Sequence, residues 1–205
     1  MTARLHPGAP ILEMDHSVIT LHEGGRPDGG ETAMLSLYDI GFSALLGAGH
    51  VALLHVPSAG VDAVFTDRLD LGRRMQARLR GMGMTMPMLT REPVVVTGLW
   101  RDPWVEGWFG YRFRAPGVDV VARWEDPEPP FYAEGPAGSG FSDTEDIWSL
   151  FVSARSASIE VNGVRAPGAP FDDAVWVPKL GRSVSSAHSA LGETRVTPHP
   201  ARRPG

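Results

Sequence analysis

The feature that most constrains the fold is an alternation of apolar and charged side chains on both sides of Pro116-Gly117. Proline fixes φ at the first position of a tight turn and glycine allows a positive φ at the second, so this dipeptide predicts a turn. Folding residues 107–125 about that turn separates one apolar face from one charged face. The predicted cross-strand pairs are Arg114 with Asp119, Phe113 with Val120, Tyr111 with Ala122 and Phe109 with Trp124. Such a hairpin has one buried and one solvated face.

A second hairpin is predicted at Asn162-Gly163, the dipeptide most typical of two-residue hairpin turns. This turn pairs Val161 with Val164 and brings the opposite charges of Glu160 and Arg165 together. Six more segments have strand-like patterns: 17–23, 32–38, 51–56, 61–66, 93–101 and 187–196.

Two segments have helix-like patterns. In residues 67–80, Leu71, Met75 and Leu79 recur on one side. Residues 143–153 follow a capping-box sequence that begins at Ser142, which predicts a helix start.

Many short strands with two helices and no long βαβ alternation predict a mainly β fold. We expect an antiparallel barrel or a strongly curved sheet with two short α-helices, lipocalin- or calycin-like in general shape. Gly98-Leu99-Trp100 resembles the G-x-W element of lipocalin-type barrels, but it lies mid-chain and covers three residues, so it identifies no family.

The composition narrows the chemistry and the location. The 205 residues include no cysteine, which excludes disulfides, thiolate nucleophiles and zinc–thiolate sites. A net charge of −5 gives no electrostatic reason to bind nucleic acid. The N-terminus has no apolar core of a signal sequence, and the longest apolar stretch, Phe42 to Leu54, is too short to span a membrane, so we expect a cytoplasmic protein. Residues 11–197 are predicted to form a single β-rich domain, with a flexible arm at 1–10 and a disordered tail at 198–205.

Aromatic and methionine side chains are the predicted ligand contacts. Strand aromatics with large flat faces are typical of pocket walls, although they also fill cores. Met82, Met84, Met86 and Met88 alternate along the chain, which places their thioethers on one side of an extended segment. They suit an adaptable lid, a Cu(I) site or a plain core. The predicted ligand-binding residues are Trp100, Trp104, Phe109, Phe113, Trp124, Met84 and Met86.

Four residues are candidate acid–base catalysts because their strand register places them among apolar neighbours: His55, Asp39, Tyr111 and His188. Burial of an imidazole lowers its pKa and leaves a neutral proton acceptor. No dinucleotide-binding or P-loop spacing occurs, so we expect no cofactor. The histidine spacing also predicts no metal site, with one assembled from distant strands as the alternative.

These patterns lead to three hypotheses about function. The first is a cofactor-independent cyclase, isomerase, hydratase or lyase that encloses an apolar or aromatic small molecule in a barrel pocket and moves protons. The second is a non-catalytic binding or carrier protein on the same scaffold. The third is a structural module with an exposed aromatic face, for which a homodimer is the candidate assembly. None of the three needs nucleic acid or a membrane as a partner.

Overall fold

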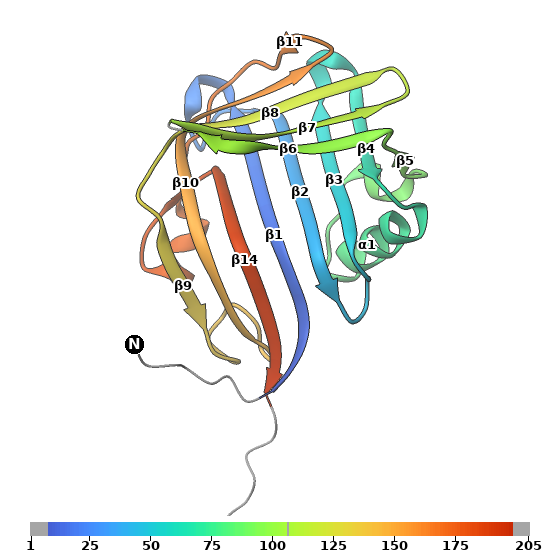
Figure 1. Cartoon of the computed structure of the whole chain (residues 1–205). Helices are drawn as coiled ribbons and strands as arrows, with labels where there is room; N and C mark the ends of the chain where they lie inside the picture. The colour runs from blue at the N-terminus through green and yellow to red at the C-terminus, as the bar shows by residue number, and fades with distance from the viewer. Residues whose placement is uncertain (1–7, 106, 199–205) are drawn as a thin grey trace, which may run out of the picture.

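The computed structural model describes residues 8–105 and 107–198, which form a mainly β protein with two short α-helices (Figure 1). The strands are β1 (Gly8–His22), β2 (Glu31–Ser43), β3 (Gly49–Val56), β4 (Val61–Thr66), β5 (Val94–Val95), β6 (Gly98–Val105), β7 (Trp108–Ala115), β8 (Val118–Pro127), β9 (Phe131–Gly135), β10 (Asp146–Val161), β11 (Val164–Arg165), β12 (Asp172–Asp173), β13 (Val184–Ser185) and β14 (Ala187–Pro198). The α-helices are α1 (Leu69–Gly81) and α2 (Val177–Leu180). Short 3-10 helices occupy Glu23–Gly25, Pro57–Ala59, Pro87–Thr90 and Ala174–Trp176.

One strongly curled sheet dominates the molecule, as predicted. Its strand order is β5-β4-β3-β2-β1-β14-β10-β8-β7-β6, with β9 and β11 also paired to β10. All these pairs are antiparallel except β4 with β5. The sheet curls because β10 pairs with β14 along its first half and with β8 along its second half. As a result β6, β7 and β8 cross over the upper ends of β1 to β4 (Figure 1).

The two ends of this sheet meet at one corner. The chain passes directly from β5 to β6 through residues 96 and 97. The Val96 N–H donates to the Thr66 carbonyl of β4 at 2.9 Å, and the Thr97 N–H donates to the Arg114 carbonyl of β7 at 2.7 Å. These two bonds link opposite ends of the sheet, so the structure is a partly closed barrel.

The curl gives the sheet an inner and an outer face, each with its own core. On the inner face, Phe109, Tyr111, Phe113 and Trp124 are completely buried against the side chains of β1 to β4. On the outer face, α1 packs Leu71, Met75 and Leu79 against β3 and β4. A smaller cluster around Phe151 lies beneath Trp176 and Leu180, next to and within α2. The space between the sheet halves is therefore filled where the aromatic hairpin crosses it.

Both predicted hairpins are confirmed, including their register. β7 and β8 pair Arg114 with Asp119 and Phe109 with Trp124, and β10 and β11 pair Glu160 with Arg165. Asn162 has φ 53° and Gly163 has φ 77°, the left-handed conformations that a type I′ turn requires. The strands run further than predicted at the ends of the chain, since Gly8 of the expected arm pairs with Pro198.

The helix predicted at 67–80 is confirmed as α1, but the one predicted at 143–153 is wrong. That segment enters β10, where Ile147, Ser149 and Phe151 are buried at every second position. The Ser142 hydroxyl does accept the N–H groups of Thr144 and Glu145, at 3.3 and 3.2 Å, but this local turn leads into a strand. The second helix is α2 instead. Within the described chain, neither α-helix has the length and hydrophobicity needed to span a membrane.

Candidate functional site: a groove on the outer face

Two adjoining cavities of about 330 and 150 Å³ lie on the outer face of the sheet. They share His16, Met82, Met84 and Arg195 in their walls, so we treat them as one feature, the outer groove. Its wall consists of Leu12, Met14, His16, Tyr38, Leu46, Met75, Arg78, Leu79, Met82, Met84, Ala133, Gly135, Phe141, Ile147, Ser149, Phe151, Trp176, Lys179, Glu193 and Arg195. The groove lies between the loop after α1 and the α2 segment, with β1, β14 and β10 as its floor.

Strand alternation brings His16 to the floor of the groove. His16 lies opposite Tyr38 of β2 and Ala190 of β14. Its ring stacks on Tyr38 with centroids 4.3 Å apart, and its Nε2 lies 2.9 Å from the Ser36 hydroxyl. Burial lowers the pKa of His16 to about 3, with His188 and Arg195 adding to the effect. The ring is therefore neutral at neutral pH and serves as a flat hydrogen-bonding surface.

Arg195 supplies the fixed charge of the floor. Its Nε donates to Glu193 at 2.7 Å and a terminal nitrogen donates to Glu145 at 3.2 Å. Burial opposes the charge on Arg195, but the two carboxylates hold its pKa above the ordinary value. The guanidinium is thus locked in place, as a group that orients a ligand must be.

Thioethers and aromatic rings form the walls. Met82 and Met84 follow α1 and are 61% and 39% exposed. On the other side Phe151 meets Trp176 edge-to-face at 5.5 Å, and the Lys179 ammonium lies 5.6 Å from the Trp176 ring. Flexible methionines opposite rigid rings are typical of a wall that adapts to an apolar ligand.

The four alternating methionines do not share one side, contrary to the expectation from an extended segment. Met82 ends α1, its N–H bonding to the carbonyls of Arg78 and Leu79. Gly83 then takes φ 88°, and Pro87 begins a 3-10 helix that buries Met88. These breaks rotate the chain, so that Met82 and Met84 line the groove while Met86 and Met88 pack into the outer core.

A second group of polar residues lies on the inner face, and we call it the inner polar cluster: Asp15, Asp39, His50, Asp67, Arg101 and Tyr111. His50 lies between two carboxylates, with its Nε2 3.1 Å from Asp39 and its Nδ1 2.9 Å from Asp67. The hydrogen bond to Asp39 is the main reason that the pKa of His50 rises to about 9. The same bond lowers the pKa of Asp39. His50 is therefore a cation at neutral pH.

Tyr111 borders this cluster from the crossing hairpin. The Arg101 guanidinium lies 5.5 Å from its ring centroid and donates a 2.6 Å bond to Asp15. Burial raises the pKa of Tyr111 to about 12. Its hydroxyl is buried and makes no hydrogen bond of ordinary length and angle with a residue of the described chain, although the Ser17 hydroxyl lies near enough to oppose the rise in the Tyr111 pKa. Such a hydroxyl is costly to keep buried, so it is a place where a water or a ligand oxygen would be favourable.

The four predicted catalytic residues are not brought together. Asp39 and Tyr111 both belong to the inner polar cluster. His55 of β3 lies opposite Met34 of β2. Met34 is five positions from Asp39, so His55 is about 16 Å from Asp39 along the strand direction. The Nδ1 of His55 is 3.1 Å from Asp62. His188 is buried on the outer face, where its Nδ1 donates to the Ser185 carbonyl and its ring stacks on Phe151.

The predicted ligand contacts are also dispersed. Phe109, Phe113 and Trp124 are completely buried in the inner core, where the Trp124 indole donates to the Val18 carbonyl. Trp100 is 49% exposed and borders a separate hollow beside Arg112 and Arg114. The side chain of Trp104 lies outside the part of the chain that the structure describes. Of the methionines, Met84 lines the outer groove and Met86 does not.

Sequence reasoning missed the residues that form most of the groove. Because a helix was predicted at 143–153, Ile147, Ser149 and Phe151 were not assigned to one face of a strand. Their spacing of two residues is the strand pattern that would have placed them together. His16 follows Leu12 and Met14 at strand spacing, which also points to a shared face. Arg195 had no comparable pattern, because its partner Glu145 is distant in the sequence.

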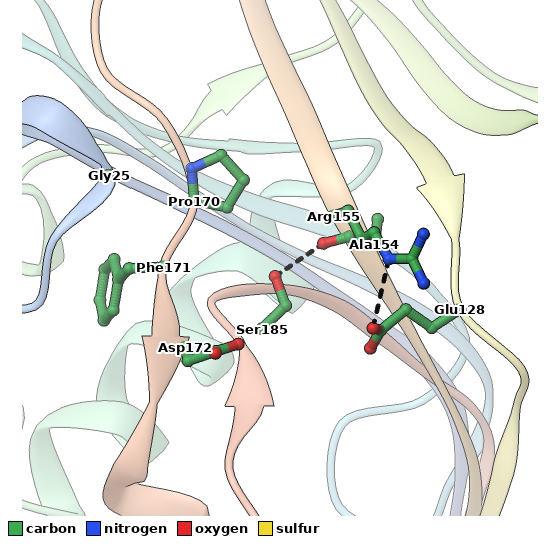
Figure 2. A pocket seen from close by; sticks show the side chains of 8 residues that line it. All are labelled: Gly25, Glu128, Ala154, Arg155, Pro170, Phe171, Asp172 and Ser185. Atoms are coloured by element: carbon green, nitrogen blue, oxygen red, sulfur yellow. Dashed lines mark hydrogen bonds and ion pairs between the residues drawn. The ribbon is translucent and has the colours of Figure 1, made fainter.

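A further hollow of about 400 Å³ lies between β10 and the β12–β13 hairpin (Figure 2). Its wall is polar, with Phe171 as its single aromatic residue. Three of its polar side chains already have partners: the Ser185 hydroxyl donates to the Ala154 carbonyl at 2.7 Å, and Arg155 lies 3.6 Å from Glu128. This hollow therefore lacks the apolar walls typical of a ligand pocket.

The fold and the groove define a curled β-sheet protein with a ligand-sized hollow on its outer face. No family model matches the chain, and no curated protein or solved structure is significantly similar to it. Within residues 8–105 and 107–198, no three His, Asp or Glu side chains are grouped closely enough to hold a metal ion.

Proposed function

We propose that this protein binds a small apolar or amphipathic molecule in the outer groove. The observation that carries the proposal is the pair of adjoining cavities, about 330 and 150 Å³, with thioether and aromatic walls over one polar floor. This size and composition are typical of small-molecule sites, in which apolar walls supply affinity and a few polar groups set orientation.

The inner face supports a binding site less well. Phe109, Phe113 and Trp124 fill the space in which a barrel pocket was expected. The sheet itself separates the outer groove from Asp39 and Tyr111, so a ligand in the groove would not reach them. Acid–base catalysis by those two residues stays a hypothesis, because neither lines any of the hollows described above.

Binding without catalysis also fits the chemistry of the groove. A His16 whose pKa is about 3 is a weak base at neutral pH. Glu193, which lines the groove, and Glu145 are both held by Arg195. The groove thus offers shape and fixed hydrogen-bonding groups more than a proton-transfer pair.

The proposal is tested with a neutral apolar fluorescent probe, N-phenyl-1-naphthylamine, whose emission rises when it enters an apolar site. We expect saturable binding with one probe per chain. Met84→Glu places a charge in the groove wall and should weaken binding at least tenfold. The matched control is Val164→Glu, at an exposed apolar position on β11 outside the groove. Equal loss in both variants, or no saturable binding, would contradict the proposal.

A further inference from the structure

The charges that line the outer groove differ in sign from the charge of the whole chain. The chain has a net charge of −5, whereas the groove wall contains three cations, Arg78, Lys179 and Arg195, and one carboxylate, Glu193. Arg195 is neutralised by Glu193 and Glu145. Arg78 and Lys179 form no ion pair with any residue in the described ranges of the chain. The groove therefore has positive charge that the protein does not balance.

The two cavities of the groove differ in their polar groups. The smaller cavity is bordered by Arg78, Arg195, His16 and Tyr38, and no carboxylate lines it. Burial keeps His16 neutral and raises the pKa of Tyr38, so neither ring brings a negative charge. This end of the groove offers two guanidinium groups and neutral hydrogen-bonding rings.

The larger cavity is bordered by the aromatic side chains Phe141, Phe151 and Trp176. It also contains Glu193, which would repel an anion, and the exposed Lys179 at its border. An apolar group fits this end better than a second acid does, because aromatic faces gain most from the burial of apolar area.

We propose, resting on the function proposed above, that the ligand is a monocarboxylate with an apolar body. Its carboxylate binds Arg78 in the smaller cavity and its apolar body occupies the larger one. The planar guanidinium of Arg78 can donate two parallel hydrogen bonds to a carboxylate, which gives both affinity and orientation. Among the described residues, Arg78 is the one cation lining the smaller cavity that has no ion pair, so that cavity suits a ligand with one negative charge.

Three ten-carbon molecules separate this proposal from the function on which it rests: decanoate, decan-1-ol and decylamine. Each is titrated at neutral pH and low salt against bound N-phenyl-1-naphthylamine. We expect decanoate to compete at least tenfold better than decan-1-ol, because a hydrogen bond to a charged group is worth about that factor. Decylamine should be the weakest competitor, and added salt should reduce the preference for decanoate.

The variant Arg78→Gln tests where the carboxylate lies. It should remove the preference for decanoate, measured within the variant as the ratio of the decanoate and decan-1-ol competition constants. Arg74→Gln is the matched control, since Arg74 is an exposed arginine one turn earlier in α1, paired with Asp70 outside the groove. It makes the same change in net charge and should retain the preference.

Each other outcome has a defined meaning. Equal competition by decanoate and decan-1-ol in the wild type would overturn the anion proposal and leave binding in the groove intact. Loss of the preference in Lys179→Gln but not in Arg78→Gln would overturn the placement of the carboxylate. Absence of saturable probe binding would overturn the proposed function itself.

Discussion

Two histidines on opposite faces of the same sheet have opposite charge states at neutral pH. His50, on the inner face, lies between Asp39 and Asp67 and has a pKa raised to about 9. His16, on the outer face, is partly buried beside Arg195 and has a pKa lowered to about 3. The neighbours of an imidazole, and not its place on a strand, decide whether it is charged.

This difference extends to the two faces as a whole. The inner face is filled by aromatic rings, and its charged groups pair with one another: His50 with two aspartates, and Arg101 with Asp15. The outer face leaves cavities, and two of the cations around them, Arg78 and Lys179, form no ion pair within the described chain. The inner face is therefore the more completely packed of the two, and the outer face carries the groove in which we propose that a ligand binds.

The largest effect expected from this comparison concerns packing. Phe113 is completely buried and its ring lies 5.2 Å from that of Phe65, whereas Met84 lies partly exposed in the groove wall. Phe113→Ala should lower the free energy of unfolding by about 3–5 kcal/mol, and Met84→Ala by about 0.5 kcal/mol or less. Urea denaturation followed by tryptophan fluorescence measures both. Similar values for the two variants would remove the distinction between a filled and an open face.

The next effect is the acid sensitivity that His16 causes. Unfolded His16 binds a proton near pH 6.5 but folded His16 does so only near pH 3, so the unfolded state gains more protons as the pH falls between these values. His16 therefore reduces stability progressively below pH 6.5. His16→Gln, which can keep a hydrogen bond to Ser36, should be less sensitive, by about 1–3 kcal/mol at pH 4. Denaturant midpoints at pH 4 and pH 7 give the comparison, and parallel losses in both proteins would contradict it.

His50 should have the opposite pH dependence. Below pH 6.5 both folded and unfolded His50 are protonated, so the stabilisation from Asp39 and Asp67 is fully present. Between pH 6.5 and 9 the unfolded state loses its proton first, and the stabilisation falls as the pH rises until it is gone above about 9. After discounting for partial exposure, the loss should be about 1–2 kcal/mol. His50→Gln should abolish this slope, and Asp39→Asn should lower the imidazole pKa measured by NMR titration.

These faces were predictable from the sequence to different extents. The hairpins at Pro116-Gly117 and Asn162-Gly163 were predicted to the exact register, because turn chemistry and alternation are local properties. The first half of β10 was not predicted as a strand, because a serine turn before it imitates a helix cap and its bulge interrupts the alternation. Because of that error, the β10 residues that line the groove were not predicted to share a face.

The site residues were harder to predict than the strands. Register correctly suggested that Asp39 and Tyr111 point toward the interior, but it could not show that the interior is full there. The groove depends on contacts between residues far apart in the chain, such as Arg195 with Glu145 and Phe151 with Trp176. Such pairs form because the sheet curls, and the curl cannot be predicted from a short sequence pattern.

The smallest predicted effect concerns the Tyr111 hydroxyl, which is buried near the Ser17 hydroxyl but makes no well-formed hydrogen bond within the described residues. Removing it by Tyr111→Phe takes away an unpaired polar group and retains the ring that packs against Trp124. If the inner face only stabilises the fold, the variant should be unchanged or more stable, within about 1 kcal/mol, by urea denaturation. A loss of more than about 1.5 kcal/mol would mean that the hydroxyl has a partner, such as a buried water, in solution. The inner polar cluster would then contain a second polar site, and the assignment of binding to the outer face alone would no longer hold.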